Sequence, residues 1–491
     1  MNIEKEFFAS AAYDFDLYEN IVVGSGPGGS LAACMLAEAG RDVMILEEGI
    51  YHSKDKIPPF SVDEMQYQYR NGGVTMAFGK PRVQYVEAIT LGGGSEINSG
   101  LYHRLPEEVC ERWKKDYRLA SLSYKDIIKF ASQIEKDICV SKLPCPPPVA
   151  SCLLAEGSEA LGWKCLEVPR WHRYDVAQPS GERQTMTKTY LPRALKAGAK
   201  LASGVRVTKI KREKNFWVAE GVRICLEEGK PYNIALRCRN LFLAAGAVQT
   251  PALLAQSGFK GKFGHALHMH PTIKVVALFP EEMNSIDMGV PVHQVKEFEG
   301  ISFGCSISNP HYLSVSMLNQ PQGLDIVRNC WKQMAIYYAM ITPEGRGRVR
   351  SLPHFSNPLV TCSLTRRDMI LLSAALKNLS KLLFAAGATA LYPTITGLNP
   401  FNKIDDLSSL PNALPPSKSS LMTIHLTSAM AMAGDSALGP VDEWGKLYAA
   451  EDIYISDAGI LPTAPGVNPQ GTLLALVRRN MEHFLNKARL K

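Results

Sequence analysis

Two kinds of apolar run alternate along the 491 residues of the chain. Short runs, such as Ile21 to Val23 and Leu241 to Ala244, have the length of buried strands, whereas the run from Gly471 to Leu485 has the length of a helix. Proline-rich breaks at Leu143 to Val149 and Leu407 to Ser420 predict spacers, because proline is excluded from helix interiors and central strands. The alternation predicts a mixed α/β or α+β fold.

The region from Ile21 to Glu47 combines a strand, a glycine-rich turn, a helix and a second strand. The turn carries Gly24-Ser25-Gly26-Pro27-Gly28-Gly29, a GxGxxG pattern, and the second strand, Val43 to Leu46, ends at the acid Glu47. A glycine pattern alone is weak evidence, because such turns also close ordinary loops. Its order and spacing with two strands, a helix and an acid predict a dinucleotide site.

Each part of this region has a physical role in holding the ADP half of a dinucleotide. Gly24 permits a tight turn, Gly26 lets the backbone approach a pyrophosphate, and Gly29 lets helix and strand pack closely. The helix N-terminus faces the phosphates. A carboxylate at Glu47 accepts hydrogen bonds from the adenosine ribose, which argues against a 2'-phosphate and hence against NADP. The region leaves FAD and NAD as alternatives.

The composition is that of a soluble globular protein large enough to bury a cofactor. Hydrophobic residues make up 46% of the chain, its mean hydropathy is −0.07, and no apolar run reaches the roughly 18 residues of a membrane span. The length predicts two to four domains, or two large interleaved ones. The N-terminus lacks a basic region followed by an apolar core, so it does not resemble a secretory signal, and we expect a cytoplasmic location.

Charge and cysteine usage argue against two further classes of protein. The net charge of +7 is spread along the chain without a basic block, which argues against nucleic acid as a partner. The eleven cysteines include no C-x-x-C pair, which favours reduced, buried thiols over a disulfide framework or a zinc site.

Three later segments complement the first. Thr90 to Gly100 is a glycine-rich loop that lets backbone approach something flat or bulky, although a simple flexible turn is the alternative. In Asn240 to Gly258, a strand ends in small residues and Pro251 stands in the first turn of a helix. In Ile453 to Asn480, a strand ends at an acid and a GVNPQ sequence leads into a long helix.

Together the four segments resemble the glucose-methanol-choline (GMC) oxidoreductase family, flavoenzymes that oxidise alcohols. The signature regions of that family are similar to Leu91 to Ser95 with Asn98, to Gly246 to Gly258, and to Asp457 to Pro462 followed by Pro465 to Gln470. Four ordered matches are strong evidence, where any one alone is weak. The GVNP sequence and the helix after it are most similar to the bacterial cholesterol oxidase branch.

The resemblance implies the fold and resolves the cofactor as FAD. The expected fold is a Rossmann-like FAD-binding domain, residues 1–105, 190–270 and 415–491, with an interleaved substrate-binding domain on an antiparallel sheet, residues 106–189 and 271–414. Ile97 stands about where some relatives carry the histidine that bonds the flavin, so we expect noncovalent FAD. The cofactor-binding residues that we expect are Gly24, Gly26, Pro27, Gly28, Gly29, Glu47, Gly93, Gly94, Asn98, Val207, Ala245, Gly246, Asp457, Ala458, Asn468 and Pro469.

The resemblance also implies a catalytic pair. Flavin-dependent alcohol oxidation moves a hydride from the carbinol carbon to flavin N5 while the hydroxyl proton leaves. Histidine can accept or organise that proton because its pKa lies near working pH. His425 resembles the family's active-site histidine, as base or proton organiser, and Asn468 resembles the partner that holds the substrate oxygen. Without this context, a lone histidine among apolar residues is more often a core residue.

The expected substrate is a small-molecule alcohol, apolar or bulky, and the electron acceptor is oxygen or another oxidant. Two alternatives keep the fold: a lyase or tailoring enzyme without net redox turnover, and a catalytically silent flavin-binding protein. No metal site is assigned. The resemblance implies that His268 and His270 lie where the chain crosses into the substrate domain, so we do not interpret them as metal ligands. Ser428 and Ala433 replace glycines that usually follow the histidine in the family, so we expect a differently shaped loop.

Overall fold

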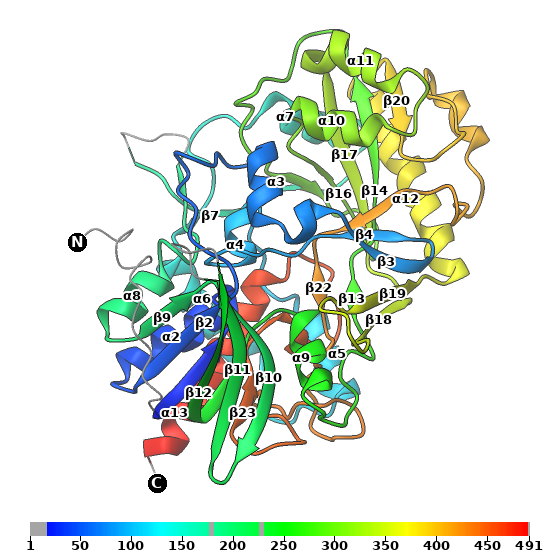
Figure 1. Cartoon of the computed structure of the whole chain (residues 1–491). Coiled ribbons are helices and arrows are strands. Elements are labelled where there is room, and N and C mark those ends of the chain that lie inside the picture. Colours follow the sequence, from blue (N-terminus) through cyan, green and yellow to red (C-terminus); the bar gives the residue numbers. More distant parts are fainter. Residues whose placement is uncertain (1–16, 176–180, 225–229, 490–491) are drawn as a thin grey trace.

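Two large sheets organise the protein, whose computed structural model describes residues 17–175, 181–224 and 230–489. The first sheet has seven strands and the second has eleven. In Figure 1 the first sheet lies in the lower half of the molecule and the second in the upper half, and the chain crosses between them repeatedly. The predicted mixed α/β fold is confirmed.

The first sheet has a parallel core of strands that are apolar along their length. β1 (Leu17–Val23) pairs in parallel with β2 (Val43–Glu47) on one side and with β12 (Pro231–Leu243) on the other. All five residues of β2 are buried, as parallel strands covered on both faces require. The remaining strands of this sheet are β9 (Lys200–Ser203), β10 (Val205–Glu213), β11 (Phe216–Ile224) and β23 (Ile453–Ile455).

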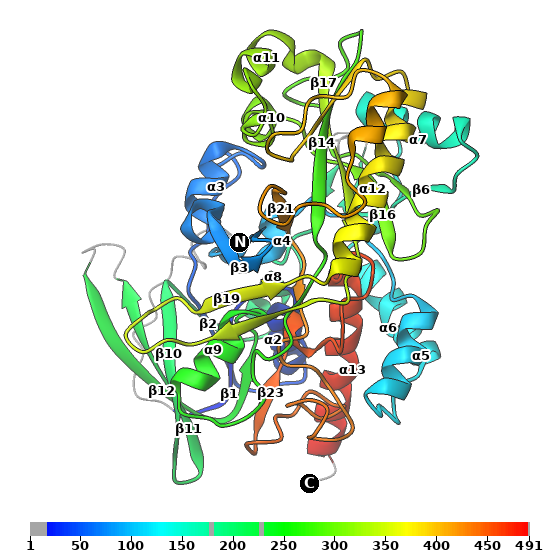
Figure 2. The ribbon, with the colours of Figure 1, turned by 90° about the vertical axis from the view of Figure 1, so that its right-hand side faces the viewer.

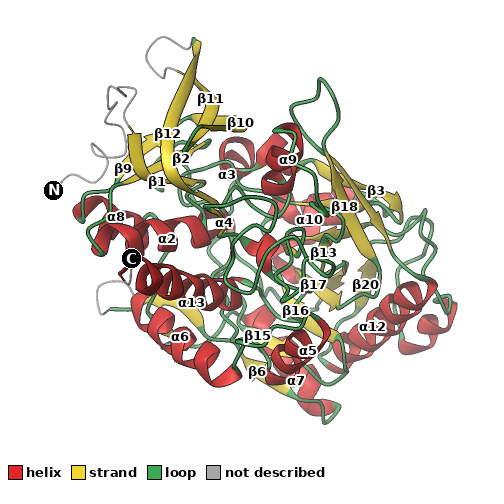
Figure 3. Ribbon diagram, turned by 90° about the horizontal axis from the view of Figure 1, so that it is seen from below, coloured by secondary structure: helices red, strands yellow, loops and turns green. Residues whose placement is uncertain are grey.

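A layer of helices covers one side of this sheet (Figure 3). α2 (Pro27–Glu38) begins at a proline, which is tolerated there because the first-turn N–H groups have no intrahelical partner. A Cβ on Gly28 would lie 1.8 Å from the Ser456 carbonyl oxygen, so the helix packs against the backbone just after β23 more closely than any side chain allows. The neighbouring helices are α5 (Glu107–Asp116), α6 (Tyr124–Asp137), α8 (Tyr190–Lys196) and α13 (Gln470–Arg489).

The second sheet is mostly antiparallel and is centred on β14 (Thr272–Leu278) and β17 (Met334–Ile341). One face of this pair packs on α12 (Arg366–Ala385), beside which lies α7 (Val149–Ala160) (Figure 2). The other strands of the sheet are β3 (Thr75–Lys80), β4 (Val83–Tyr85), β6 (Cys165–Glu167), β15 (His293–Val295), β16 (Ile301–Cys305), β18 (Arg346–Arg350), β19 (Leu359–Ser363), β20 (Ala390–Pro393) and β21 (Leu421–Thr423).

Shorter elements fill the space around the two sheets. The glycine-rich segment expected as a loop contains a short helix, α4 (Gly94–Ile97), in its second half. None of the helices in the described ranges has the length and apolar character that a bilayer crossing requires. The remaining elements are α3 (Val62–Gln68), α9 (Gln249–Gln256), α10 (Pro310–Met317), α11 (Gly323–Cys330), β5 (Val140–Ser141), β7 (Arg170–Arg173), β8 (Glu182–Arg183), β13 (His268–Met269) and β22 (Leu426–Thr427), besides four short 3-10 turns.

Candidate active site

A cavity of about 560 Å³ extends from the parallel strands of the first sheet to β14 and β17 of the second. Its lining includes both expected catalytic residues, His425 and Asn468. It also includes every expected cofactor-binding residue except Gly29. The structure therefore gathers segments that lie more than four hundred positions apart in the sequence around one space.

The glycines of the first turn serve two different purposes. Gly24 has φ +102°, and a Cβ there would lie 2.2 Å from the Ala244 carbonyl oxygen. A Cβ on Gly29 would lie 2.1 Å from the Gly24 carbonyl oxygen, so this glycine serves packing between helix and strand and does not face the cavity. At Gly26, by contrast, an added Cβ would meet nothing within 4 Å. Gly26 thus exposes bare backbone to the cavity at the N-terminus of α2, as pyrophosphate binding requires.

Glu47 holds this turn in place through three hydrogen bonds. Its Oε2 accepts from the Ser25 N–H and from Ser25 Oγ, each at 2.7 Å, and its Oε1 accepts from the Gly49 N–H at 2.7 Å. Burial raises the pKa of this carboxyl, and these hydrogen bonds oppose the shift. A carboxylate offers about four acceptor positions, so one remains for a ribose hydroxyl. Ser25 Oγ also accepts from the Gly92 N–H at 3.0 Å, which joins the turn to the glycine-rich segment.

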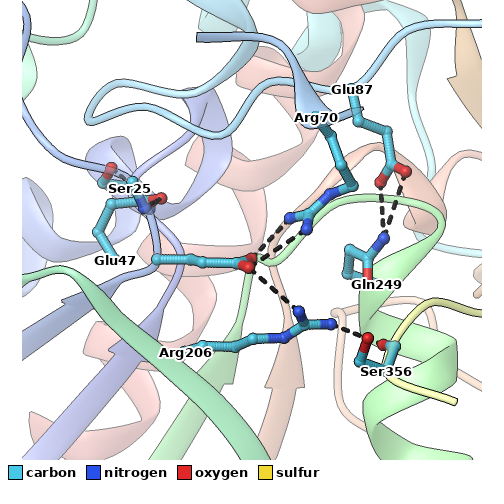
Figure 4. A network of polar contacts seen from close by, with 9 residues as sticks. Ser25, Glu47, Arg70, Glu87, Arg206, Gln249 and Ser356 are labelled. Atoms are coloured by element: carbon cyan, nitrogen blue, oxygen red, sulfur yellow. Dashed lines mark hydrogen bonds and ion pairs between the residues drawn. The ribbon is translucent and has the colours of Figure 1, made fainter. Parts of the chain in front are cut away.

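A network of charges surrounds the part of the cavity next to Glu47 (Figure 4). Arg70 forms two hydrogen bonds with Glu48, at 3.2 and 2.6 Å, and Arg206 lies 3.5 Å from the same carboxylate. Gln249 Nε2 donates to both oxygens of Glu87, at 3.1 and 3.2 Å. Both arginines are thus paired with a protein carboxylate. The selection against NADP expected from Glu47 stays a prediction.

Asp457 ties together the segments near the middle of the cavity. Its Oδ2 accepts from the Gly246 N–H at 3.1 Å and from Thr250 Oγ1 at 2.5 Å, while its Oδ1 accepts from the Gly459 N–H at 2.8 Å. Asp457 therefore positions the backbone at Gly246, where φ is +95° and an added Cβ would meet nothing within 4 Å. This second stretch of open backbone lines the same cavity as Gly26.

Asn98 joins the glycine-rich segment to the start of α13. Its Nδ2 donates to Gln470 Oε1 at 2.9 Å, and its Oδ1 accepts from the Gly100 N–H at 3.0 Å. Gln470 follows Asn468 by two residues and lines the cavity as well. Asn98 consequently helps to fix the loop that carries Asn468.

His425 and Asn468 meet on the wall of the cavity. The Asn468 side-chain nitrogen lies 3.4 Å from His425 Nε2. On its other side, His425 Nδ1 lies 2.9 Å from Nδ1 of His270, and the two rings are nearly perpendicular, at 86°. Burial, and then the positive charge of Lys296, lowers the pKa of His425 to about 4, so the ring is neutral at pH 7.

The hydrogen bonds around this pair determine where the protons lie. The Gly466 N–H donates to His270 Nε2 at 3.1 Å, so a neutral His270 carries its proton on Nδ1. That proton is donated to His425 Nδ1, and a neutral His425 then carries its own proton on Nε2. The amide oxygen of Asn468 complements this proton once the side-chain amide is turned by 180°, a change that leaves its shape unaltered. His425 thus presents an N–H to the cavity.

Sequence reasoning missed three residues of this site. His270, interpreted as part of a crossover, contacts His425 directly. Ser25 occupies a variable position of the GxGxxG pattern, yet its hydroxyl bridges two loops. Gln470 binds Asn98, its neighbour in space but 372 positions away in sequence. The signal that was available for His270 was its place two residues before β14, next to a proline.

The loop after His425 contains an unusual backbone conformation. Ser428 has φ +73°, in the left-handed region that glycine adopts without strain. Its hydroxyl donates to Thr427 Oγ1 at 2.9 Å, and its N–H donates to the Ala458 carbonyl at 3.1 Å. Serine therefore takes here a conformation typical of glycine, and the substitution does not by itself require a different loop path.

Two family models of GMC oxidoreductases match the chain, over residues 65–272 and 343–476. An uncharacterized GMC-type oxidoreductase of Sinorhizobium fredii is 33% identical over 475 residues, which cover 95% of this chain and 94% of that protein. A long-chain-alcohol oxidase of Arabidopsis thaliana is 24% identical over 498 residues, which cover 92% of this chain and 64% of that protein. The crystal structure of pyridoxine 4-oxidase from Mesorbium loti superposes with a TM-score of 0.71 at 17% identity, covering 95% of this chain and 99% of that one.

The chain belongs to the GMC oxidoreductase family and is an FAD-dependent oxidoreductase. The cavity fits that cofactor on three structural grounds. Gly26 and Gly246 leave open backbone where a bulky ligand can approach. Glu47 retains one acceptor position, and the nearby arginines are paired with Glu48.

Proposed function

We propose that the protein oxidises a primary or secondary alcohol with a sizeable apolar part, and that His425 and Asn468 hold the substrate oxygen. The observation that carries this proposal is the 3.4 Å approach of the two side chains within the cofactor cavity. Bound FAD would accept a hydride from the carbinol carbon. The chain would bind it through the backbone at Gly26 and the carboxylate of Glu47.

Of the two roles left open for His425, the hydrogen-bond pattern favours proton organiser over base. With its proton on Nε2, His425 donates to the substrate oxygen and holds the carbinol hydrogen toward the flavin. The hydroxyl proton then leaves to solvent water as the hydride is transferred, so that the alcohol loses one hydride and one proton to become the carbonyl product. A pKa of about 4 also makes the ring a weak base near neutral pH. Asn468 presents a second polar group to the same oxygen.

An apolar substrate is supported by the lining of the cavity beyond this pair. The side chains there come from β17 and β21 of the second sheet, from α10 and from loops, and they are mainly aliphatic or aromatic: Phe60, Val290, Ile307, Tyr312, Val315, Ile336, Tyr338, Met340 and Met422. The similarity to long-chain-alcohol oxidases of Arabidopsis thaliana supports the same choice. Placement within the cholesterol oxidase branch rests on Asn468 and the GVNP sequence and stays a prediction.

Anaerobic mixing of the purified flavoprotein with 1-decanol tests the proposal. We expect the visible flavin absorbance to bleach, and the rate at which air restores it then separates an oxidase from a dehydrogenase. A flavin that stays oxidised while the alcohol is converted would instead indicate the lyase alternative. Denaturation in acid should release the flavin from the polypeptide, because Ile97 cannot form a covalent bond to it.

A further inference from the structure

Lys274 lies on the face of β14 that lines the cavity. Along this strand, Ile273 and Val275 belong to the apolar core shared with α12, whereas Thr272 and Lys274 alternate with them and line the cavity. The residue opposite Lys274 on β17 is Tyr338, which also lines the cavity. Figure 2 shows β14 extending toward α10, and the strand belongs to the second sheet, so Lys274 lines the part of the cavity that the second sheet forms.

Lys274 differs from the other charged residues that line this cavity, because its charge is unpaired. Within residues 17–175, 181–224 and 230–489, its ammonium forms neither a hydrogen bond nor an ion pair. The other charged residues lining the cavity have protein partners: Glu47 has Ser25 and Gly49, Glu48 has Arg70 and Arg206, Glu87 has Gln249, and Asp457 has Thr250.

A second half-buried lysine, Lys296, shows what a structural lysine looks like in this protein. Lys296 Nζ donates to Ser302 Oγ and, at 3.4 Å, to the Gly466 carbonyl. Lys274 has no such acceptors, although burial lowers its pKa to about 8 and leaves it mainly cationic at neutral pH. Tyr338 does not supply an anion, since burial raises its pKa to about 12 and its hydroxyl accepts from Gln294 Nε2. A half-buried cation without a protein partner is a suitable place for a ligand that brings the counter-charge.

The position of Lys274 on the strand gives the ligand a length. His270, which contacts His425, stands four residues before Lys274, and four residues of extended chain span at most about 13 Å. Apolar residues occupy the wall between them, among them Met340 opposite Thr272. A single ammonium, with no second cation paired to it, matches one negative charge better than a phosphate dianion.

We propose that Lys274 binds the carboxylate of a hydroxy acid, whose hydroxyl lies at His425 and Asn468 and whose apolar chain fills the space between. The inference rests on the proposed function, because it takes the substrate hydroxyl to lie at that pair. It narrows the substrate class from an apolar alcohol to an apolar alcohol with a carboxylate at its far end. Lys274 is thus a specificity residue and takes no part in hydride or proton transfer.

The experiment compares three probes of equal chain length: 10-hydroxydecanoate, its neutral methyl ester, and 1-decanol. For the holoenzyme we expect kcat/KM to be highest for the acid, by on the order of ten- to a hundredfold, as one charge-assisted hydrogen bond provides. Lys274→Met, of similar length without the charge, should lose that preference, so that its kcat/KM for the acid falls to about that for the methyl ester. Lys274→Arg should retain part of the preference. Lys332→Met, an exposed lysine outside the cavity, is the matched control.

A binding measurement separates this inference from the proposed function. Decanoate has no hydroxyl to oxidise, and calorimetry should show it binding to the wild-type holoenzyme and to Lys332→Met but at least tenfold more weakly to Lys274→Met. If no alcohol bleaches the flavin but decanoate binding depends on Lys274, the proposed function fails and the anion site stands. Equal decanoate binding to wild type and Lys274→Met, or equal losses of 1-decanol and hydroxy acid turnover in Lys274→Met, would overturn the inference. Flavin content and thermal unfolding establish that each variant is folded.

Discussion

His270 and His425 face each other through their Nδ1 atoms at 2.9 Å, with their rings almost perpendicular. One partner of this pair is itself fixed by backbone, since the Gly466 N–H occupies His270 Nε2. The direction of the hydrogen bonds therefore runs from Gly466 through His270 to His425. His270 is a positioning residue that holds one tautomer of His425, comparable to the groups that orient metal-bound and catalytic histidines elsewhere.

Replacing His270 with phenylalanine should release that tautomer while preserving ring volume. We expect turnover to fall about tenfold or more, because only part of the His425 population would then present an N–H to the substrate. The direct readout is the ¹⁵N chemical shift of His425, which should move from a protonated Nε2 toward a mixture of tautomers. His268→Phe is the matched control, since His268 is buried two residues earlier and does not line the cavity. An unchanged His425 spectrum in His270→Phe would disprove the positioning role.

Replacing His425 itself should separate catalysis from cofactor binding. We expect His425→Ala to lower the rate of anaerobic flavin reduction by on the order of a hundredfold or more, as loss of a proton-handling group does. The flavin content should stay at the wild-type level, because the open backbone and carboxylate that fit FAD lie at Gly26, Glu47 and Gly246. Full-rate reduction by His425→Ala would contradict the assignment of the catalytic pair.

How far the sequence predicted this site depends on how local each feature is. Gly24, Gly26 and Glu47 fall within one strand-turn-helix-strand unit, so their spacing carried the prediction. The role of His270 depends on a contact with a residue 155 positions away, which no local pattern encodes. Lys274 did leave a local trace, because Thr272 and Lys274 are polar positions alternating with apolar ones in the strand sequence TIKVVAL. The sequence pattern does not tell what lies opposite these two side chains, because the cavity is formed by segments from distant parts of the chain.

The glycines of the first turn allow a sharp comparison between folding and cofactor binding. An added Cβ at Gly26 meets no protein atom within 4 Å, and its φ of −62° suits any residue, so Gly26→Ala should fold with wild-type stability. The new methyl group projects into the open space, so we expect FAD affinity to fall by at least tenfold. Fluorescence titration of the apoprotein with FAD measures the loss. Wild-type affinity would show that Gly26 does not approach the cofactor.

Gly28→Ala should show the opposite behaviour. Its Cβ would lie 1.8 Å from the Ser456 carbonyl oxygen, and backbone on both sides leaves no flexible group to move away. We expect a loss of stability of about 2 kcal/mol or more, as overpacking in a well-packed region produces. Denaturant unfolding of apoprotein checks this value, and apoprotein stability equal to that of Gly26→Ala would contradict it.

A buried histidine with a lowered pKa makes the free energy of unfolding depend on pH. Replacing His268 isolates the contribution of one such residue. Burial, and then the charge of Arg346, lowers the pKa of His268 to about 4, against 6.5 for an unburied histidine. Between those values the unfolded chain binds a proton that the folded protein does not, so this contribution to stability is complete above pH 6.5 and is lost as the pH falls toward 4. At about 1.4 kcal/mol per pKa unit, the loss by pH 4 is on the order of 3 kcal/mol.

Buried carboxyl groups with a raised pKa change the free energy of unfolding with pH in the opposite direction. Their contribution must be subtracted before the effect of His268 can be seen. Burial raises the pKa of Glu64 to about 7, so its folded form takes up a proton first as the pH falls. A comparison of wild type with His268→Phe removes such terms, because both proteins contain the same carboxyl groups. Urea unfolding at pH 7 and pH 4 should show the wild type losing about 3 kcal/mol more than His268→Phe over that interval. Parallel stability curves for the two proteins would mean that His268 titrates normally in the folded state.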